Sequence, residues 1–191
     1  ARETLEALSA DAFAAYRVDD ALLDAIEYGA SKGMLFVAAA GNDGRSNDTT
    51  PTYPGSYTSE AVVSVAATDH NDALAFFSNY GGKSVDLGAP GVNILSTTRN
   101  GTYAAFQGTS MATPHVAGVA ALLAARFPSA SPYGLKALLL RSVDPVASLA
   151  GKTTTGGRLN AFTAVSCDAE PKVWLGSPSQ GFVAGLGDVL P

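Results

Sequence analysis

The sequence predicts an α/β fold in which a mostly parallel sheet is flanked by helices. Residues 34–40 form a continuous apolar run, and residues 61–68 form a second run rich in valine. Short apolar runs of this kind are typical of parallel strands covered on both faces. Residues 111–125 carry no formal charge if His115 is neutral, and they are too few to cross a bilayer. They therefore predict a helix that is buried on nearly all sides.

The composition fits one main globular domain with a short appendage. With 191 residues, of which 47% are hydrophobic and 15% charged, the chain is long enough to bury a core. A net charge of −5 and the scattered placement of the 12 basic residues argue against nucleic acid as a partner. Cys167 is the only cysteine, which excludes an intrachain disulfide. Charged residues throughout positions 1–20 exclude the hydrophobic core of a signal peptide there.

The first elements in chain order are expected to be helical. Residues 1–17 are alanine-rich and predict a partly helical segment without an assigned role. Asp19 or Asp20 can cap the next helix, which Gly33 is expected to end. The apolar face of this helix is expected to contain Leu22, Leu23, Ile26 and Ala30.

The strand over residues 34–40 ends in Gly41-Asn42. Open α/β sheets gather ligands at the carboxyl ends of their strands, which makes Asn42 a candidate functional residue. Asn42 can equally be a turn residue that tolerates a left-handed conformation. The polar loop that follows contains the glycosylation sequon Asn47-Asp48-Thr49, which has meaning only in a eukaryotic secretory pathway.

Between the second strand and the uncharged helix, the sequence predicts a loop, an inward carboxylate and a hairpin. The aromatic residues in the loop over 76–81 are expected in the core. Asp86 is flanked by apolar residues, and a carboxylate that points inward there needs a partner. Asn100-Gly101 between β-prone flanks predicts a hairpin over residues 94–104 with a type I′ turn.

The uncharged helix is expected to pack through one face and to end at Phe127-Pro128. That face has the helical spacing i, i+3, i+4 and i+7 and contains Val116, Val119, Ala120 and Leu123. Pro114 has no N–H and leaves the carbonyl of Ser110 without its helical partner, so the first turn is expected to open or kink. Ser131-Pro132 predicts the start of another helix, which runs to about residue 143.

Ser110 lies where the uncharged helix begins. Its hydroxyl can simply cap the helix by accepting a hydrogen bond from a backbone N–H two or three residues later. Gly108, however, lets a ligand come close, and a helix N-terminus offers unpaired N–H groups with a partial positive charge. Those groups suit an oxyanion that forms beside Ser110, which is what acyl transfer requires.

Three segments carry a resemblance to a known family: residues 36–44 (FVAAAGNDG), 86–91 (DLGAPG) and 108–118 (GTSMATPHVAG). Together they resemble the subtilisin-like serine proteases, especially the thermitase-like branch, and the resemblance runs from about residue 22 to residue 165. It implies the C-terminal part of a three-layer peptidase domain over residues 1–165. It also implies that Ser110 is the nucleophile and that the Asn42 side chain and the Ser110 amide form an oxyanion hole.

The resemblance further implies a pocket for a peptide substrate. The residues expected to bind the substrate are Ala38, Ala39, Ala40, Gly41, Thr52 and Gly108. Thr52 can also be an ordinary loop threonine. The substrate is expected to be a polypeptide hydrolysed by a serine endopeptidase, and the protein is expected to be secreted or extracytoplasmic.

The general base and acid of a catalytic triad find no match in this chain. In the family the triad runs in the order Asp, His, Ser, and no histidine precedes Asn42. His115 lies about 140° around the helix from Ser110 and is expected to be a buried imidazole. His70 lies in a polar turn and is expected to be solvated. We therefore expect a preceding part of the same domain to supply Asp and His, and the chain alone to be close to inert.

The resemblance also implies a weakly held cation such as Ca²⁺. Asp86 is expected to supply one oxygen, with backbone carbonyls near Gly55 and Tyr57, although one aspartate does not define a site. No organic cofactor is expected. Residues 166–191 are rich in proline and glycine and predict a linker or the start of an appended domain.

Other functions fit the sequence less well. Residues 108–112 loosely resemble the Gly-x-Ser-x-Gly elbow of α/β-hydrolases, but His115 is the only histidine that follows, and no acid lies between. A nucleotide-binding role for residues 40–44 is not favoured, because this segment has neither a Gly-x-Gly-x-x-Gly pattern nor a Gly-Lys-Ser/Thr terminus. The remaining alternative is a protease-like lobe without its triad that serves as a structural or binding module.

Overall fold

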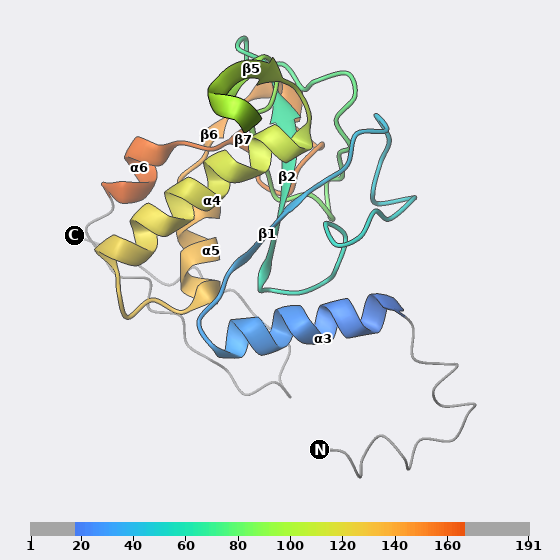
Figure 1. Ribbon diagram of the computed structural model, residues 1–191. Coiled ribbons are helices and arrows are strands. Elements are labelled where there is room, and N and C mark those ends of the chain that lie inside the picture. Colours follow the sequence, from blue (N-terminus) through green and yellow to red (C-terminus); the bar gives the residue numbers. More distant parts are fainter. Residues whose placement is uncertain (1–17, 167–191) are drawn as a thin grey trace, which may run out of the picture.

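A five-stranded sheet forms the centre of the computed structural model, which describes residues 18–166 (Figure 1). Its strands are β1 (Phe36–Ala39), β2 (Val62–Thr68), β3 (Leu87–Pro90), β6 (Asp144–Pro145) and β7 (Gly157–Arg158). They lie in the order β1-β2-β3-β7-β6; the first four run parallel, and β6 is antiparallel to β7. The predicted α/β class is therefore confirmed. The predictions for residues 1–17, Cys167 and the segment after residue 166 fall outside the described residues.

Strand β2 is the most deeply buried strand of the sheet. All seven of its residues are buried, because β1 and β3 pair with its two edges and helices pack on its faces. Strand β1 was expected to be equally covered, but it lies at the end of the sheet with β2 as its neighbour. Phe36 and Val37 are accordingly only half-buried, and Met34 is 65% exposed.

Helices pack on both faces of the sheet. On one face, Ile26 and Ala30 pack against Ala38 and Val62. On the other face, three helices enclose a larger core around Val65. The helix of the first face is α3 (Val18–Ser31), and those of the second are α4 (Thr109–Arg126), α5 (Pro132–Arg141) and α6 (Ala161–Val165).

The ends of α3 and α5 follow from local signals in the sequence. Helix α3 begins at Val18, so Asp19 and Asp20 lie in its first turn. Its last residue is Ser31, and the predicted stop, Gly33, follows in the turn with a φ of 90° that suits glycine. Helix α5 has the predicted cap, because the Ser131 hydroxyl accepts a hydrogen bond of 3.2 Å from the Gly134 N–H.

Helix α4 packs through the predicted face but is less buried than expected. Its buried apolar residues include Val116, Val119, Ala120 and Leu123, as the spacing predicts. The opposite face is uncovered in residues 18–166, and Leu122 there is 56% exposed. Complete burial was therefore wrong for the described part, because nothing in it packs on that face.

Pro114 lies inside α4 without ending it. The expected opening of the first turn is not observed as a break, because a single helix runs through the proline. Two side chains supply hydrogen bonds nearby: Thr113 Oγ1 donates to the Thr109 carbonyl, and His115 Nδ1 bonds the Met111 carbonyl, both at 2.9 Å. No helix within residues 18–166 is long and apolar enough to span a membrane.

The predicted hairpin forms a separate antiparallel pair of strands, β4 (Ile94–Thr98) and β5 (Thr102–Phe106). Asn100 and Gly101 both have positive φ, 63° and 67°, as a type I′ turn requires. The connection includes a third residue and forms the short 3-10 helix η1 (Arg99–Gly101). A second 3-10 helix, η2 (Ala147–Leu149), lies between β6 and β7.

The aromatic loop before β3 only partly matches its prediction. Phe77 packs against the large core, whereas Phe76 is 87% exposed. Core placement was therefore wrong for Phe76. Tyr80 is half-buried, with the ammonium of Lys152 3.8 Å from its ring centroid.

Candidate active site

Ser110 is the second residue of α4. The residue that caps this helix is Gly108, which has φ of 150° and makes no side-chain cap, so the interpretation of Ser110 as the cap is wrong. A side chain rarely adopts this φ, which explains the glycine. The Ser110 side chain is exposed. At the second helical position its N–H has no acceptor within the helix.

Asn42 is held against the start of α4 by hydrogen bonds. Its Oδ1 accepts from the Thr109 N–H at 2.8 Å and from the Thr109 hydroxyl at 3.0 Å. The same hydroxyl accepts from the Gly41 N–H at 3.2 Å. Because a backbone N–H can only donate, the atom that faces it must be the amide oxygen, and the amide nitrogen is left to donate elsewhere. The carboxyl end of β1 is thereby joined to the residue before Ser110.

The start of α4 offers the amide of Ser110 as an N–H donor. The Nδ2 of Asn42 is a second donor, on a side chain that bonds the preceding residue, Thr109. Donors fixed before a reaction stabilise a negative charge that develops near them, and the partial positive charge of the α4 N-terminus acts in the same direction. Chemically, this arrangement suits attack by the hydroxyl on a carbonyl group.

Neither histidine pairs with Ser110. His115 is exposed, which contradicts the expected burial, and its Nδ1 must donate because its partner is the Met111 carbonyl. His70 is exposed in its loop, as expected, with Nε2 3.2 Å from the side-chain nitrogen of Asn71. Within residues 18–166, neither histidine is therefore placed to act as the base for the hydroxyl.

Asn79 organises the loop that carries Asn42, a role that was not predicted from the sequence. This fully buried residue accepts at Oδ1 from the N–H groups of Asp43 and Arg45, at 2.8 and 3.3 Å. Its Nδ2 donates to Asn47 Oδ1 at 3.0 Å and to Thr52 Oγ1 at 3.2 Å. In the sequence, Asn79 stands out only as a polar residue in an aromatic segment, and this pattern does not predict its hydrogen-bond partners.

Gly41 leaves the space that Asn79 occupies. A Cβ atom on Gly41 would lie 2.4 Å from the Asn79 Nδ2, and the φ of 113° is also unfavourable for a side chain. The same Cβ would lie 3.2 Å from the Thr52 methyl group. Gly41 and Thr52, both predicted to bind substrate, are therefore neighbours.

The other residues predicted to bind a peptide lie in different environments. Ala38 and Ala40 are buried in core clusters, with 4% and 0% exposure, so a peptide could meet only their backbone atoms. Ala39 is half-buried. Gly108 lies beside Asn42, because a Cβ on it would be 3.6 Å from both amide atoms. Their part in substrate binding stays a prediction.

The glycosylation sequon is part of the folded core. Asn47 is 2% exposed, and its side-chain nitrogen donates to the Ala40 carbonyl at 2.8 Å. A glycan would be attached to that nitrogen, which has neither space nor access in the fold. The asparagine therefore has a structural role, linking the end of β1 to Asn79.

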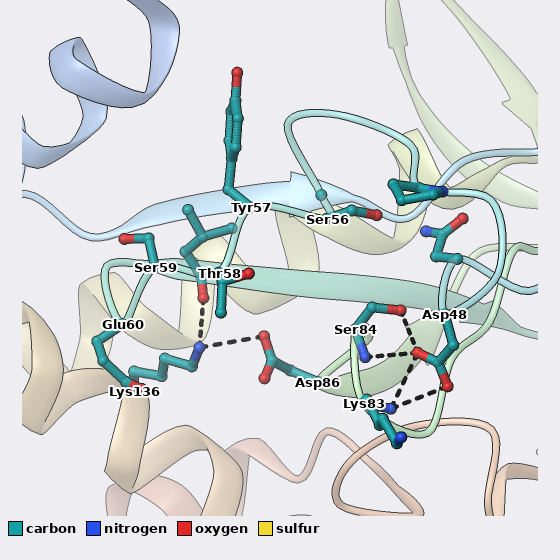
Figure 2. A pocket seen from close by; sticks show the side chains of 14 residues that line it. Asp48, Ser56, Tyr57, Thr58, Ser59, Glu60, Lys83, Ser84, Asp86 and Lys136 are labelled. Atoms are coloured by element: carbon teal, nitrogen blue, oxygen red, sulfur yellow. Dashed lines mark hydrogen bonds and ion pairs between the residues drawn. The ribbon is translucent and has the colours of Figure 1, made fainter. Parts of the chain in front are cut away.

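Asp86, Gly55 and Tyr57 line one cavity of about 420 Å³ (Figure 2). Asp86 Oδ2 accepts from the Ser64 N–H at 2.8 Å and lies 3.4 Å from the Lys136 ammonium, which is the partner that an inward carboxylate needs. Burial raises the pKa of Asp86, and Lys136 opposes that rise. Residues 18–166 contain no group of three His, Cys, Asp or Glu that could hold a metal. The expected Ca²⁺ stays a prediction.

Both the sequence and the fold are similar to those of known proteins. A family model described as the subtilase family matches residues 10–165. Thermitase from Thermoactinomyces vulgaris is 46% identical over 144 residues, which cover 75% of this chain and 48% of thermitase. A thermophilic serine proteinase from Bacillus sp. (strain AK1) is 43% identical over 145 residues, or 76% of this chain and 34% of that protein.

A solved structure gives the same result for the fold. A protease from Pseudoalteromonas arctica superposes with a TM-score of 0.67 and 36% sequence identity. The match covers 74% of this chain and 45% of the solved chain. This chain therefore spans less than half the length of each of the three relatives.

Proposed function

The chain belongs to the subtilase family, and on this premise we propose that, together with a preceding part of the same domain, it forms a serine endopeptidase with Ser110 as nucleophile. The observation that carries the proposal is the attachment of Asn42 to the start of α4 through Thr109. Because Thr109 holds the Oδ1 atom of Asn42, the Nδ2 atom remains as a donor for a bound substrate.

The proposed reaction proceeds through an acyl-enzyme. The Ser110 Oγ attacks the peptide carbonyl, and a histidine from the preceding part takes its proton. The N–H groups of Ser110 and Asn42 hold the oxyanion of the tetrahedral intermediate. The intermediate collapses as the amine leaves with the proton from the histidine. Water then hydrolyses the Ser110 ester by the same steps and restores the hydroxyl.

Two surfaces of residues 18–166 are suited to contact the preceding segment that would complete the domain. Strand β1 ends the sheet and pairs with β2 alone within residues 18–166, so its other edge is available to a further strand. The uncovered side of α4 is apolar and includes Ala117, Ala121 and Leu122. A segment that paired with β1 and covered α4 would bring its own residues close to Ser110, where the base is needed.

The substrate is a polypeptide, as the family implies. We further propose that the protein acts outside the cytoplasm, for which the family resemblance is the support. The test is to express the full-length gene with its natural upstream sequence in its host and to compare labelled protein in the medium and in the cells. Accumulation within the cells alone would contradict export.

Labelling with a fluorophosphonate probe tests the proposed nucleophile. We expect the full-length protein to be labelled, the Ser110→Ala variant to remain unlabelled, and the 191-residue chain alone to react hardly at all. Ser31→Ala is the matched control, because this hydroxyl donates to the Tyr28 carbonyl at the exposed end of α3 and should not affect labelling. Labelling that survives Ser110→Ala refutes the assignment. A folded full-length protein that is never labelled favours the alternative of a module without a triad.

A further inference from the structure

The cavity of Figure 2 contains an ion pair that peptide hydrolysis does not use. Asp86 directly precedes β3, and Lys136 extends from α5 with its ammonium directed toward the carboxylate (Figure 2). Both side chains are largely covered, with 14% and 13% exposure. An isolated carboxylate in such a position is unfavourable, so the ammonium balances a charge that would otherwise be buried alone.

The ammonium of Lys136 lies among oxygen atoms. Its Nζ donates to the Val62 carbonyl at 2.6 Å and lies 3.4 Å from Asp86 Oδ2. A carboxylate and a backbone carbonyl are also what a hard metal cation takes as ligands. A cation that coordinated Asp86 from this side would lie against the ammonium, and the two like charges would repel each other.

The other carboxylates of the cavity are placed differently. Asp48 accepts three hydrogen bonds at Oδ1, from the N–H groups of Lys83 and Ser84 and from the Ser84 hydroxyl, at 3.2, 3.0 and 2.7 Å. Asp48 therefore holds the loop that contains Lys83 and Ser84. Glu60 is exposed at the rim. Asp86 is thus the carboxylate of the cavity that Lys136 neutralises.

We propose that Lys136 is a built-in counter-ion, whose ammonium takes the place of a bound metal cation at Asp86. The natural protein then needs no ion at this position, and a small cation can bind only when the ammonium is removed. This differs from the Ca²⁺ site that the family resemblance leads one to expect at Asp86. It is independent of the proposed peptidase activity.

The covalent attachment gives the ammonium an advantage over a free ion. Helix α5 is fixed by its Ser131 cap and by the buried residues Leu135 and Leu138. The Lys136 ammonium is therefore held close to Asp86. Its local concentration does not depend on the ions in solution. The stability of the β3 region should therefore be insensitive to the choice of cation.

The test measures the thermal unfolding of the full-length protein and of Lys136→Met. Each is measured in choline chloride with a chelator, and at equal ionic strength in sodium chloride or calcium chloride. We expect Lys136→Met to unfold at a lower temperature in choline. We expect at least one small cation to raise its midpoint by about 3 °C or more beyond the rise seen for the natural protein. Subtracting the rise of the natural protein from that of the variant removes the effect of any ion that binds elsewhere.

Three controls separate this explanation from general effects. Lys83→Met removes an exposed lysine that lines the same cavity and should respond to cations as the natural protein does. Lys136→Arg keeps the positive charge and should show no added response. The double variant Asp86→Asn/Lys136→Met removes both charges and should lose the added response.

Two results would overturn the proposal. One is a folded Lys136→Met variant whose midpoint responds to cations no more than that of the natural protein. The other comes from Asp86→Asn with Lys136 present: if this change reduces the Ca²⁺ response of the natural protein, Asp86 holds a cation despite the lysine. The second measurement decides the matter even if Lys136→Met fails to fold.

Discussion

Asn79 connects two loops that carry candidate site residues. Through its Oδ1 it fixes the backbone after Asn42, and through its Nδ2 it reaches Thr52 and Asn47. All four hydrogen bonds are made by one fully buried side chain. The position of the Asn42 loop therefore depends on a residue far along the chain from it.

Replacing Asn79 should affect both stability and turnover. In Asn79→Ala, two N–H groups of the Asn42 loop lose their acceptor and the buried Asn47 side chain loses its donor, and we expect the free energy of unfolding to fall by about 2 kcal/mol or more. Because Asn42 loses its position, kcat of the full-length enzyme should fall more than KM changes. Denaturant unfolding and steady-state kinetics measure the two effects. Asn71→Ala, at an exposed asparagine, is the control and should change neither; equal effects of both variants would contradict the assigned role.

Asn42 itself should contribute to the transition state and little to substrate affinity. We expect Asn42→Ala to lower kcat by about 10²–10³ with KM nearly unchanged, a magnitude known from the corresponding loss in a subtilisin. The Asn42→Asp variant keeps the acceptor for Thr109 but loses the N–H donor, so it should be similarly slow. If Asn42→Asp retained full turnover, the amide would not be an oxyanion donor.

The two aspartates of the cavity should give opposite pH dependences. The pKa of Asp86 is raised from 3.8, chiefly by burial, so the folded state binds its proton more tightly, and the contribution of Asp86 to stability grows as pH falls through the raised pKa toward 3.8. The pKa of Asp48 is lowered: burial raises it, but hydrogen bonds from Ser84 and Lys83 lower it more. Its stabilising contribution is present above pH 3.8 and is lost as pH falls through the lowered pKa.

Denaturant unfolding over a pH series distinguishes these contributions. The natural protein should become more stable on mild acidification above pH 3.8, because Asp86 takes up a proton. The Asp86→Asn variant should not show this gain. The natural protein should lose stability below that pH as Asp48 is protonated, and the Asp48→Asn variant should not show this loss. Lys136 and Glu60 are the charged groups that act on Asp86, so they must be kept unchanged. Parallel curves for the two variants and the natural protein would show that neither pKa differs between the folded and unfolded states.

Among the elements, α4 has two sides with different roles. One side packs on the sheet through Val116 and Leu123, and its first turn presents Ser110. The other side is apolar and uncovered, although an exposed apolar strip on a helix is unfavourable in water. We therefore expect the completing segment of the domain to cover it.

Leu122→Glu tests whether the uncovered side of α4 is covered in the full-length protein. In the full-length protein this change places an unpaired charge in an interface, and we expect it to reduce the free energy of unfolding by about 3 kcal/mol. Phe162→Glu is the matched control, because Phe162 lies on α6 and is 78% exposed. It should cost less than about 0.5 kcal/mol. Equal costs for both substitutions, measured by denaturant unfolding, would mean that Leu122 stays in solvent.

At the scale of the whole molecule, the sequence predicts those structural features that depend only on residues close together in the chain. The parallel strands, the α4 packing face and the Ser131 cap could all be predicted, because run length, helical spacing and capping are local. The partners of buried polar groups could not be predicted. Lys136 donates to a carbonyl 74 positions away, and Asn79 bonds Asn47 at a separation of 32. Such pairings arise only when the sheet brings distant loops together.

The candidate site divides in the same way. A family motif placed Ser110 and Asn42 in one site from the sequence, but only the fold shows that Thr109 joins them. The exposure of His115 and of the outer side of α4 could not be predicted, because burial is a property of everything that packs around an element. Arg158 is a further example: it forms ion pairs with Asp72 in a loop and with Asp144 in strand β6.

The buried position of Asn47 also affects how the protein can be produced. In the endoplasmic reticulum, an oligosaccharyltransferase acts on nascent chains and could reach this sequon before the loop closes. A sugar attached then would exclude the Asn47 amide from its place beneath β1 and trap the chain in a non-native state. A yeast or mammalian expression host would thus put glycan transfer in competition with folding, and a bacterial host would not.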